Sequence, residues 1–178
     1  GGATSVEVPV DVDDDVDRAR ALIDRQLADA GWRVQDRKDL NLFAGPGVAV
    51  REVVMKPGHG RADYLLYVDR QAVGVIEAKP QGTTLSGVEW QSAMYADGLP
   101  DAIAKRAVTI AGRLPFVVEA NGSETHFTNG FDPDARARRL FCIPRPESLA
   151  KVIRDAETDP ARPTWRAKVR DLPALPTT

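Results

Sequence analysis

The chain has 178 residues, enough for one compact domain with a hydrophobic core and a tight fit for two. Hydrophobic residues make up 43% and charged residues 28% of the chain, which excludes the disordered, collagen-like and membrane-embedded classes. The sequence has neither a secretory signal pattern nor an apolar run near the roughly 20 residues of a membrane span, so we expect a cytoplasmic protein. The formal net charge of −2 gives no overall attraction to nucleic acid, and any such contact must come from a local patch.

The first predicted element is a helix from Val16 to Ala30. One apolar face recurs at helical spacing and consists of Val16, Ala19, Leu22, Ile23, Leu27 and Ala30. The aspartates at 13–15 suit the N-terminus of a helix, and Gly31 suits its end. A metal site in this acidic run is the alternative to a solvated cap.

Strands dominate the next part of the chain. Residues 48–55 are rich in β-branched side chains and end at a turn. Two apolar runs, residues 62–68 and 72–78, are joined by three polar residues, which is typical of a β-hairpin. Residues 85–97 and 101–107 then show helical patterns.

The last third of the chain predicts a second hairpin, a short strand and a helix. Asn121-Gly122 lies between two strand-like runs and is a strong hairpin signal. Residues 139–143 indicate a short strand, and Pro146 favours the first position of an amphipathic helix. Beyond Asp155 prolines and charges dominate, as in a linker.

These elements predict an α/β domain with a mixed central sheet flanked by helices. We divide the chain into a tail over residues 1–15, one domain over residues 16–156 and a linker over residues 157–178. Cys142 is the only cysteine, which excludes an internal disulfide and a zinc site built on cysteines. Its apolar neighbours predict a buried, reduced thiol.

Three charged residues of the first hairpin are the candidates for chemistry. Asp63 begins one strand, while Glu77 and Lys79 end the next, where alternation puts both on one face. Antiparallel pairing brings Asp63 near Glu77. Two adjacent carboxylates suit a divalent cation, with the carbonyl of Ala78 as a further ligand. Such a set fits hydrolysis of a phosphodiester with Mg²⁺, although ordinary cross-strand ion pairs explain the same spacing.

The amino-acid sequence of this hairpin resembles the core of a known family of nucleases. The segments at 60–69 and 73–79 are similar to the PD-(D/E)XK nuclease in the restriction subunit of type I restriction-modification enzymes. Gln91 and Tyr95 match that family's Q-x-x-x-Y motif, and residues 114–122 and 138–147 resemble its following hairpin and closing segment. The resemblance runs from about Arg51 to the end. Ala62, rather than proline, precedes Asp63, as in many members of that family, so this departure does not indicate an inactive site.

The resemblance implies a restriction-endonuclease-like fold and a type I site-specific deoxyribonuclease. It implies that Asp63 and Glu77 bind Mg²⁺, for which Mn²⁺ can substitute, and that Lys79 positions the attacking water near double-stranded DNA. It implies methyltransferase and specificity subunits as partners. A helicase-like motor would follow the nuclease, and ATP would be used only there, because the chain has no Walker A sequence.

Other polar and charged residues are further candidates for contacts at the site or with DNA. Glu52 is either an auxiliary catalytic residue, as a metal ligand or an acid near the phosphate, or a surface charge, and Arg61 is a candidate phosphate contact. Gln91 and Tyr95 share a helix face that either contacts DNA or packs on the sheet. A basic stretch either follows the DNA backbone, faces a neighbouring domain or is solvated; it consists of Arg136, Arg138, Arg139, Arg145, Lys151 and Arg154.

Two rival functions remain open at this stage. One is a nuclease-like docking or DNA-holding module whose metal site is silent. The other is a related nuclease that acts on RNA or on single-stranded DNA.

Overall fold

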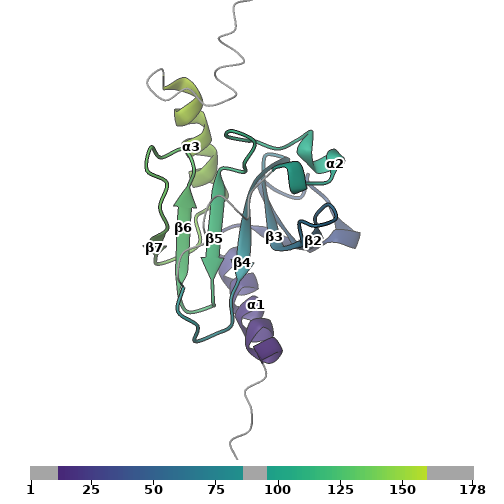
Figure 1. Ribbon diagram of the computed structural model, residues 1–178, viewed down its shortest axis with the longest axis vertical. Coiled ribbons are helices and arrows are strands. Elements are labelled where there is room, and N and C mark those ends of the chain that lie inside the picture. Colours follow the sequence, from purple (N-terminus) through teal and green to yellow (C-terminus); the bar gives the residue numbers. More distant parts are fainter. Residues whose placement is uncertain (1–11, 86–95, 160–178) are drawn as a thin grey trace, which may run out of the picture.

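A computed structural model describes residues 12–85 and 96–159 of the chain, and seven strands within these residues form one sheet (Figure 1). In order across the sheet they are β1 (Arg33–Asp36), β2 (Gly47–Val54), β3 (Arg61–Val68), β4 (Gln71–Ala78), β5 (Phe116–Ala120), β6 (Thr125–Asn129) and β7 (Arg138–Leu140). The described helices are α1 (Val12–Asp29), α2 (Asp101–Ala104) and α3 (Pro146–Thr158), with 3-10 turns η1 (Arg37–Asp39) and η2 (Ala96–Gly98).

The sheet is mixed, as the sequence predicts. Strands β1 and β2 are parallel, and so are β4 and β5, whereas every other neighbouring pair is antiparallel. The α/β class with a mixed, helix-flanked sheet is therefore confirmed. Because β4 lies between an antiparallel and a parallel neighbour, both edges of its backbone are paired along most of its length.

Helix α1 carries at its two ends the residues that its sequence suggests as end signals. The three aspartates at 13–15 lie in its first turn, where they stabilise the positive end of the helix dipole. At the other end Gly31 adopts a φ of +94°, and the amide of Trp32 donates to the carbonyl of Leu27 at 3.0 Å, which completes a Schellman motif. Ala19, Ile23 and Leu27 are fully buried against the sheet.

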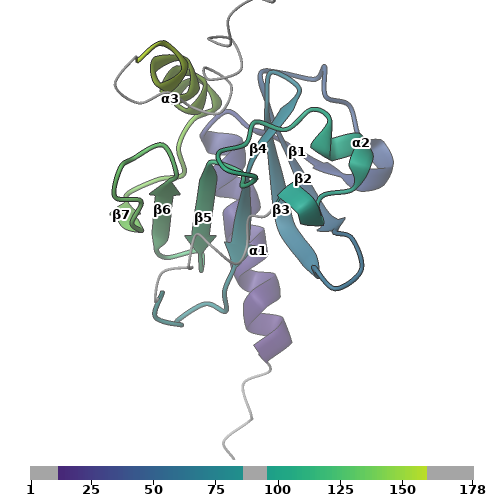
Figure 2. The same cartoon turned by 45° about the horizontal axis from the view of Figure 1, so that its top comes forward.

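Helices α1 and α2 lie on opposite faces of the sheet (Figure 2), and each face carries its own apolar cluster. On one face α1 and α3 pack through residues such as Ile23 and Leu149 over Leu66 and Phe116. On the other face the segment around η2 and α2 covers the sheet, with Leu99 fully buried among side chains of β2 to β5. The hydrophobic effect on both faces thus fixes the central strands in position.

The β3–β4 hairpin matches its prediction closely. The two strands turn through Asp69 and Arg70, which have φ values of 47° and 68°. Positive φ at both central residues is the geometry of the tight turns that suit the twist of a hairpin. The open end of this hairpin, at the other end of both strands, holds Asp63 and Glu77.

Two predicted elements are shorter than expected. The helix predicted over residues 101–107 ends at Ala104, because the chain then joins the sheet: Ala72 donates to the carbonyl of Arg106 at 2.8 Å, and Val108 donates to the carbonyl of Ala72 at 2.9 Å. Of the helix predicted over residues 85–97, positions 86–95 lie outside the described residues, and positions 96–98 form η2.

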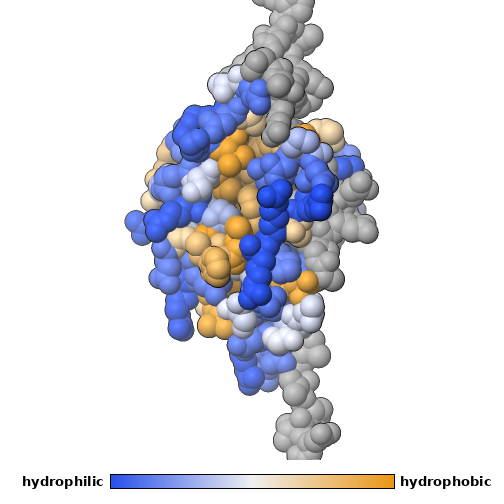
Figure 3. Space-filling view, turned by 90° about the vertical axis from the view of Figure 1, so that its left-hand side faces the viewer, coloured by the Kyte–Doolittle hydropathy of each residue, from blue (hydrophilic) through white to orange (hydrophobic). Residues whose placement is uncertain are grey.

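The strand predicted over residues 139–143 is β7, which ends at Leu140, and the prediction of a buried Cys142 is wrong. Cys142 and Phe141 are exposed, while Ile143 of the same apolar run is buried. The reason is that β7 is an edge strand that pairs only with β6 in the described sheet, so the chain leaves the sheet before Phe141. The surface on the β7 side accordingly shows a hydrophobic area bordered by hydrophilic side chains (Figure 3).

The boundaries of the helical parts differ slightly from the expected division of the chain. Helix α1 begins at Val12 rather than at Val16, and α3 continues to Thr158. The linker predicted over residues 157–178 lies outside the described residues from position 160 onward. Among the described residues, no helix combines the length and the apolar character needed to cross a membrane.

Candidate functional site

The candidate site forms where the ladder between β3 and β4 stops. This ladder ends at the pair of Tyr64 with Ile76, whereas β4 stays paired with β5 as far as Ala78 and Ala120. Beyond Ile76 the amide of Ala78 donates to Oδ2 of Asp63 at 2.9 Å. A side-chain carboxylate thus accepts the hydrogen bond that a backbone carbonyl of β3 would otherwise accept.

This bond also orients the backbone of β4. The amide of Lys79 donates to the carbonyl of Ala120 at 2.8 Å, so the backbone of Lys79 faces β5. The backbone groups of successive strand residues point to opposite neighbours, and both polar groups of one residue point the same way. The carbonyl of Ala78 is therefore directed toward β3, the side on which Asp63 lies.

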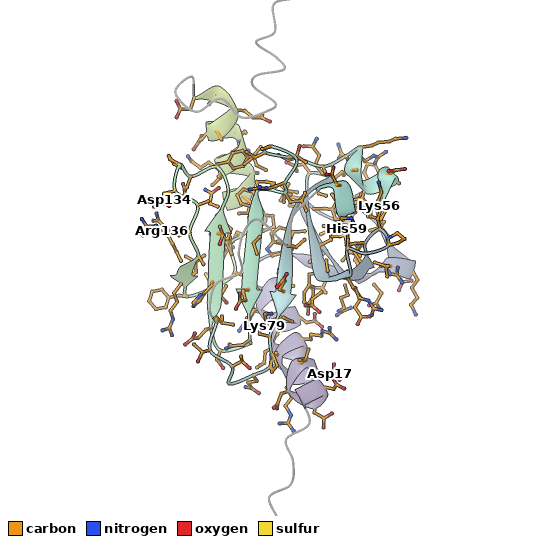
Figure 4. The ribbon with its side chains drawn as sticks, viewed as in Figure 1. Asp17, Lys56, His59, Lys79, Asp134 and Arg136 are labelled. Carbon is orange, nitrogen blue, oxygen red and sulfur yellow. The ribbon has the colours of Figure 1, made fainter. Side chains whose placement is uncertain are left out.

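Glu77 is half-buried and surrounded by charge. Burial raises its pKa, the ammonium of Lys79 opposes that rise, and the carboxylates of Asp63 and Glu119 add to it. Nζ of Lys79 lies 3.9 Å from Oε2 of Glu77, as expected for two side chains on one face of a strand. Figure 4 places Lys79 at the end of β4, beside α1, on which Asp17 is labelled. The structure therefore brings Asp63, Glu77 and Lys79 together.

Arg20 of α1 is part of the site and was not anticipated from the sequence. Its Nη2 donates to Oδ1 of Asp63 at 2.6 Å. Its Nη1 lies 3.6 Å from Oε1 of Glu52 and 3.7 Å from Oδ1 of Asp17. The pKa of Arg20 is raised: burial acts to lower it, but the bond to Asp63 and the nearby carboxylates outweigh burial. The guanidinium is thus a fixed positive charge among three carboxylates.

Glu52 and Arg61 lie at the edge of this cluster. Glu52 is a non-glycine residue with a φ of 53°, between the pairs Arg51–Tyr64 and Val53–Ala62. Its Oε1 lies 3.9 Å from Nη1 of Arg61, and both side chains are more than half exposed. Glu52 therefore stands close enough to interact with Arg20, while Arg61 is an exposed cation at the rim.

Glu119 is a further carboxylate that the sequence analysis did not single out. It is only 3% exposed, and it pairs in register with Glu77 on one side and His126 on the other. In-register neighbours share a face of the sheet, so Glu119 lies beside Glu77. One signal was available: it is the single charged residue in the otherwise apolar run Phe116–Ala120.

The donor set suits a hard divalent cation with an incomplete protein shell. No group of three or more His, Cys, Asp and Glu side chains within residues 12–85 and 96–159 is arranged to hold a metal ion. Mg²⁺ is nevertheless commonly held by one or two carboxylates, with waters and substrate phosphate completing the shell. Asp63, Glu77 and the carbonyl of Ala78 fit this requirement, and the guanidinium of Arg20 shows that Asp63 accepts a cationic partner.

Of the other predicted contacts, some lie outside the described residues and some pair with nearby carboxylates. Gln91 and Tyr95 lie outside the described residues. Within the basic stretch, Arg136 pairs with Asp134, Nζ of Lys151 lies 2.6 Å from Asp155, and Arg139 lies 3.8 Å from Glu124. These carboxylates offset the charge of three of the six basic residues of the stretch.

Comparison with known proteins agrees with this architecture. Residues 44–129 match the family model described as the second domain of the endonuclease subunit of the type I restriction enzyme EcoKI. A solved fragment described as an HsdR subunit of a type I restriction enzyme from Vibrio vulnificus YJ016 is similar in fold, with a TM-score of 0.54 and 21% sequence identity. The match covers 80% of this chain and 26% of that fragment. None of the curated proteins matches the sequence.

The fold and the matched segment together define the class: an α/β domain with a restriction-endonuclease-like core. The matched residues 44–129 run from just before β2 to the end of β6, so they include Asp63, Glu77 and Lys79. The chain spans about a quarter of the solved fragment, and the similarity between the two is one of fold.

Proposed function

We propose that the chain is a Mg²⁺-dependent endonuclease domain of a type I restriction enzyme, which hydrolyses phosphodiester bonds of double-stranded DNA. The observation that carries the proposal is the meeting of Asp63, Glu77 and Lys79 where β3 and β4 stop pairing. The match to the endonuclease-subunit family supports the same conclusion.

Asp63, Glu77 and the carbonyl of Ala78 would hold the metal. Bound Mg²⁺ would neutralise negative charge that develops on the phosphate. The pKa of Glu77 is already raised, so this carboxyl gains more than an exposed one from a cation beside it. The hydrogen bond from Ala78 fixes the orientation of Asp63 before any cation arrives.

Lys79 would position the attacking water near the scissile phosphate. Its ammonium is a compact charge on a flexible stem and lies beside Glu77. Arg61, exposed at the rim, would contact a neighbouring phosphate. Gln91 and Tyr95 would contribute to substrate binding through the motif that they match.

The wider assignment follows from the family. We place the domain in the cytoplasm, in a complex with methyltransferase and specificity subunits, where a separate motor domain consumes ATP. Because the described residues contain no zinc finger or basic recognition helix, recognition of the DNA sequence would reside in those partners.

A plasmid-nicking assay with Mg²⁺ or Mn²⁺ tests the proposal. The Glu77→Gln variant should cleave at least about 100-fold more slowly than the parent, because it loses a charged metal ligand. The matched control is Glu147→Gln, the same change at an exposed position in the first turn of α3, which should cleave like the parent. Single-stranded DNA and RNA of the same sequence serve as competing substrates.

Titration calorimetry with Mn²⁺ provides an independent measurement. The parent should bind Mn²⁺, and Glu77→Gln and Asp63→Asn should each bind it far more weakly. Equal cleavage by folded Glu77→Gln and parent, or a parent that binds no Mn²⁺, would contradict the proposal.

One observation favours a second candidate, a catalytically silent module that docks or holds DNA. Arg20 already neutralises Asp63 within the protein, so the site is electrostatically complete without a metal. A silent module predicts no Mn²⁺ binding and equal stability with and without the ion. The same calorimetric titration therefore separates the two functions.

A further inference from the structure

We infer that Arg20 is a built-in competitor of the metal: its guanidinium occupies Asp63 in the metal-free protein and must leave Oδ1 when a divalent cation binds. The inference rests on the proposed function, since it concerns the same carboxylate. It assigns a positioning role to a residue of α1, which lies outside the segment that matches the family model.

The first argument is that both oxygens of Asp63 are already engaged. Oδ2 accepts from the amide of Ala78 at 2.9 Å, and Oδ1 accepts from Nη2 of Arg20 at 2.6 Å. The amide belongs to the sheet and stays in place. A metal that binds Asp63 through Oδ1 therefore competes with Arg20 for that oxygen.

The second argument is electrostatic. Arginine stays protonated in proteins, so Arg20 cannot yield by losing its charge. A cation at Oδ1 would lie within a few ångströms of the guanidinium, in a partly buried place where like charges repel more strongly than in water. Metal and guanidinium consequently cannot both lie against Oδ1 at full affinity.

The third argument is that Arg20 has other partners within reach. Its Nη1 lies 3.6 Å from Glu52 and 3.7 Å from Asp17, both beyond ordinary hydrogen-bond distance. Its buried Nε has no hydrogen-bond acceptor among the described residues. A buried donor without an acceptor is unusual in a settled structure, so the present position of the side chain leaves room for a better one.

The fourth argument is that α1 itself is held in place, so the side chain moves and the helix does not. The hydroxyl of Tyr64 donates to Oδ1 of Asp24 at 2.6 Å and lies 3.1 Å from the carbonyl of Arg20. Arg51 donates to both oxygens of Asp24. The backbone of Arg20 is thus fixed beside β3, and its long side chain provides the freedom.

Calorimetric titration with Mn²⁺ tests the inference on four proteins: the parent, Arg20→Gln, Arg20→Lys and Arg18→Gln. Arg20→Gln should bind Mn²⁺ at least about tenfold more tightly, because the competing charge is gone. Arg20→Lys keeps the charge and should stay within about threefold of the parent. Arg18→Gln is the matched control, since Arg18 lies on the same helix, is mostly exposed and pairs with Asp15 rather than with the site.

Thermal unfolding with and without Mn²⁺ gives a second measurement that is independent of cleavage. The rise in Tm that Mn²⁺ produces should be larger for Arg20→Gln than for the parent. It also shows whether each variant is folded. If Arg20→Gln fails to fold, Arg20→Met serves in its place, because it retains much of the side-chain volume without the charge.

The outcomes separate this inference from the proposed function. Equal or weaker Mn²⁺ binding by Arg20→Gln, with binding still lost in Asp63→Asn, overturns only the competition. An equal gain in Arg20→Gln and Arg18→Gln also overturns it, because a general charge effect would then suffice. No binding by either the parent or Arg20→Gln overturns both the competition and the metal-dependent function.

Discussion

The middle of the β3–β4 hairpin is apolar, whereas its open end is charged. In the middle, Leu65 and Leu66 are fully buried and pair with Val75 and Gly74 in the backbone ladder. At the open end the ladder is replaced by a carboxylate that bridges to the amide of Ala78, and half-buried charges take the place of apolar side chains. The middle contributes stability, whereas the end holds groups that are costly without a partner.

This contrast explains why the folded protein tolerates charged residues at the open end of the hairpin. Charges at half-buried positions oppose folding unless neighbours compensate them, and the apolar middle supplies the stability that tolerates them. The same two strands therefore serve as scaffold and as site, a few residues apart. Changes in the middle should alter stability, and changes at the end should alter pH and metal dependence.

The largest effect is expected in the middle, from Leu66→Ala. Leu66 is fully buried in the cluster under α1 and α3, so the change should lower the free energy of unfolding by about 2–5 kcal/mol. Denaturant unfolding measures this loss. At a temperature where the variant is folded, its Mn²⁺ affinity should stay within a few-fold of the parent's. A large loss of affinity in the folded variant would show that the middle and the end are not separable.

A smaller effect, dependent on pH, is expected at the end from Glu77→Gln. Burial foremost, with Asp63 and Glu119, raises the pKa of Glu77 above its ordinary value of 4.5 despite the opposing charge of Lys79. The folded chain therefore keeps this proton at pH values at which the unfolded chain has lost it. In the metal-free parent, stability should fall as the pH rises from 4.5 through the raised pKa.

Glutamine cannot ionise, so Glu77→Gln does not lose stability as the pH rises through this range. Relative to the parent, its free energy of unfolding should be higher above the raised pKa of Glu77 and unchanged below pH 4.5. Unfolding free energies measured in EDTA from acid to neutral pH check the sign. A difference between the two proteins that shrinks as the pH rises would contradict the assignment of the pKa shift. Glu147→Gln provides the control with an exposed glutamate.

The smallest effect is expected from Glu52→Gly, also at the end. Glu52 holds a φ of 53°, which glycine adopts without the steric cost of a Cβ atom. The backbone gain and the lost proximity to Arg20 partly offset each other, so we expect a change in unfolding free energy of at most about 1 kcal/mol. A loss of several kcal/mol would mean that the Glu52 carboxylate, rather than its backbone, sets the structure there.

Much of the fold could be predicted because its signals are local. The apolar periodicity of α1, the hairpin turn at Asp69 and Arg70, and the proline that opens α3 each act within a few residues. The lengths of α2 and β7 could not be predicted in this way. They depend on Ala72 accepting a new backbone partner and on β7 being an edge of the sheet, and both are tertiary facts.

Some residues of the candidate site could be predicted from local sequence signals, and others depend on tertiary packing. Asp63, Glu77 and Lys79 could be grouped because antiparallel pairing and strand alternation follow from a recognised hairpin. Arg20 could not be added to them, because it lies 43 residues before Asp63 and approaches from a helix whose rotation no local pattern fixes. Glu119 is intermediate: its strand was predicted, but its parallel pairing with β4 crosses a long connection.

The bond network around Asp24 has a consequence for how accurately the site is built. Asp24 lies one helical turn beyond Arg20 and receives hydrogen bonds from Tyr64 of β3 and Arg51 of β2. Tyr64 is also the immediate neighbour of Asp63. The hydrogen bonds to Asp24 thus fix the position of α1 relative to the strand that carries Asp63. The accuracy with which Arg20 is placed beside Asp63 therefore depends on Asp24, Tyr64 and Arg51, none of which takes part in the chemistry.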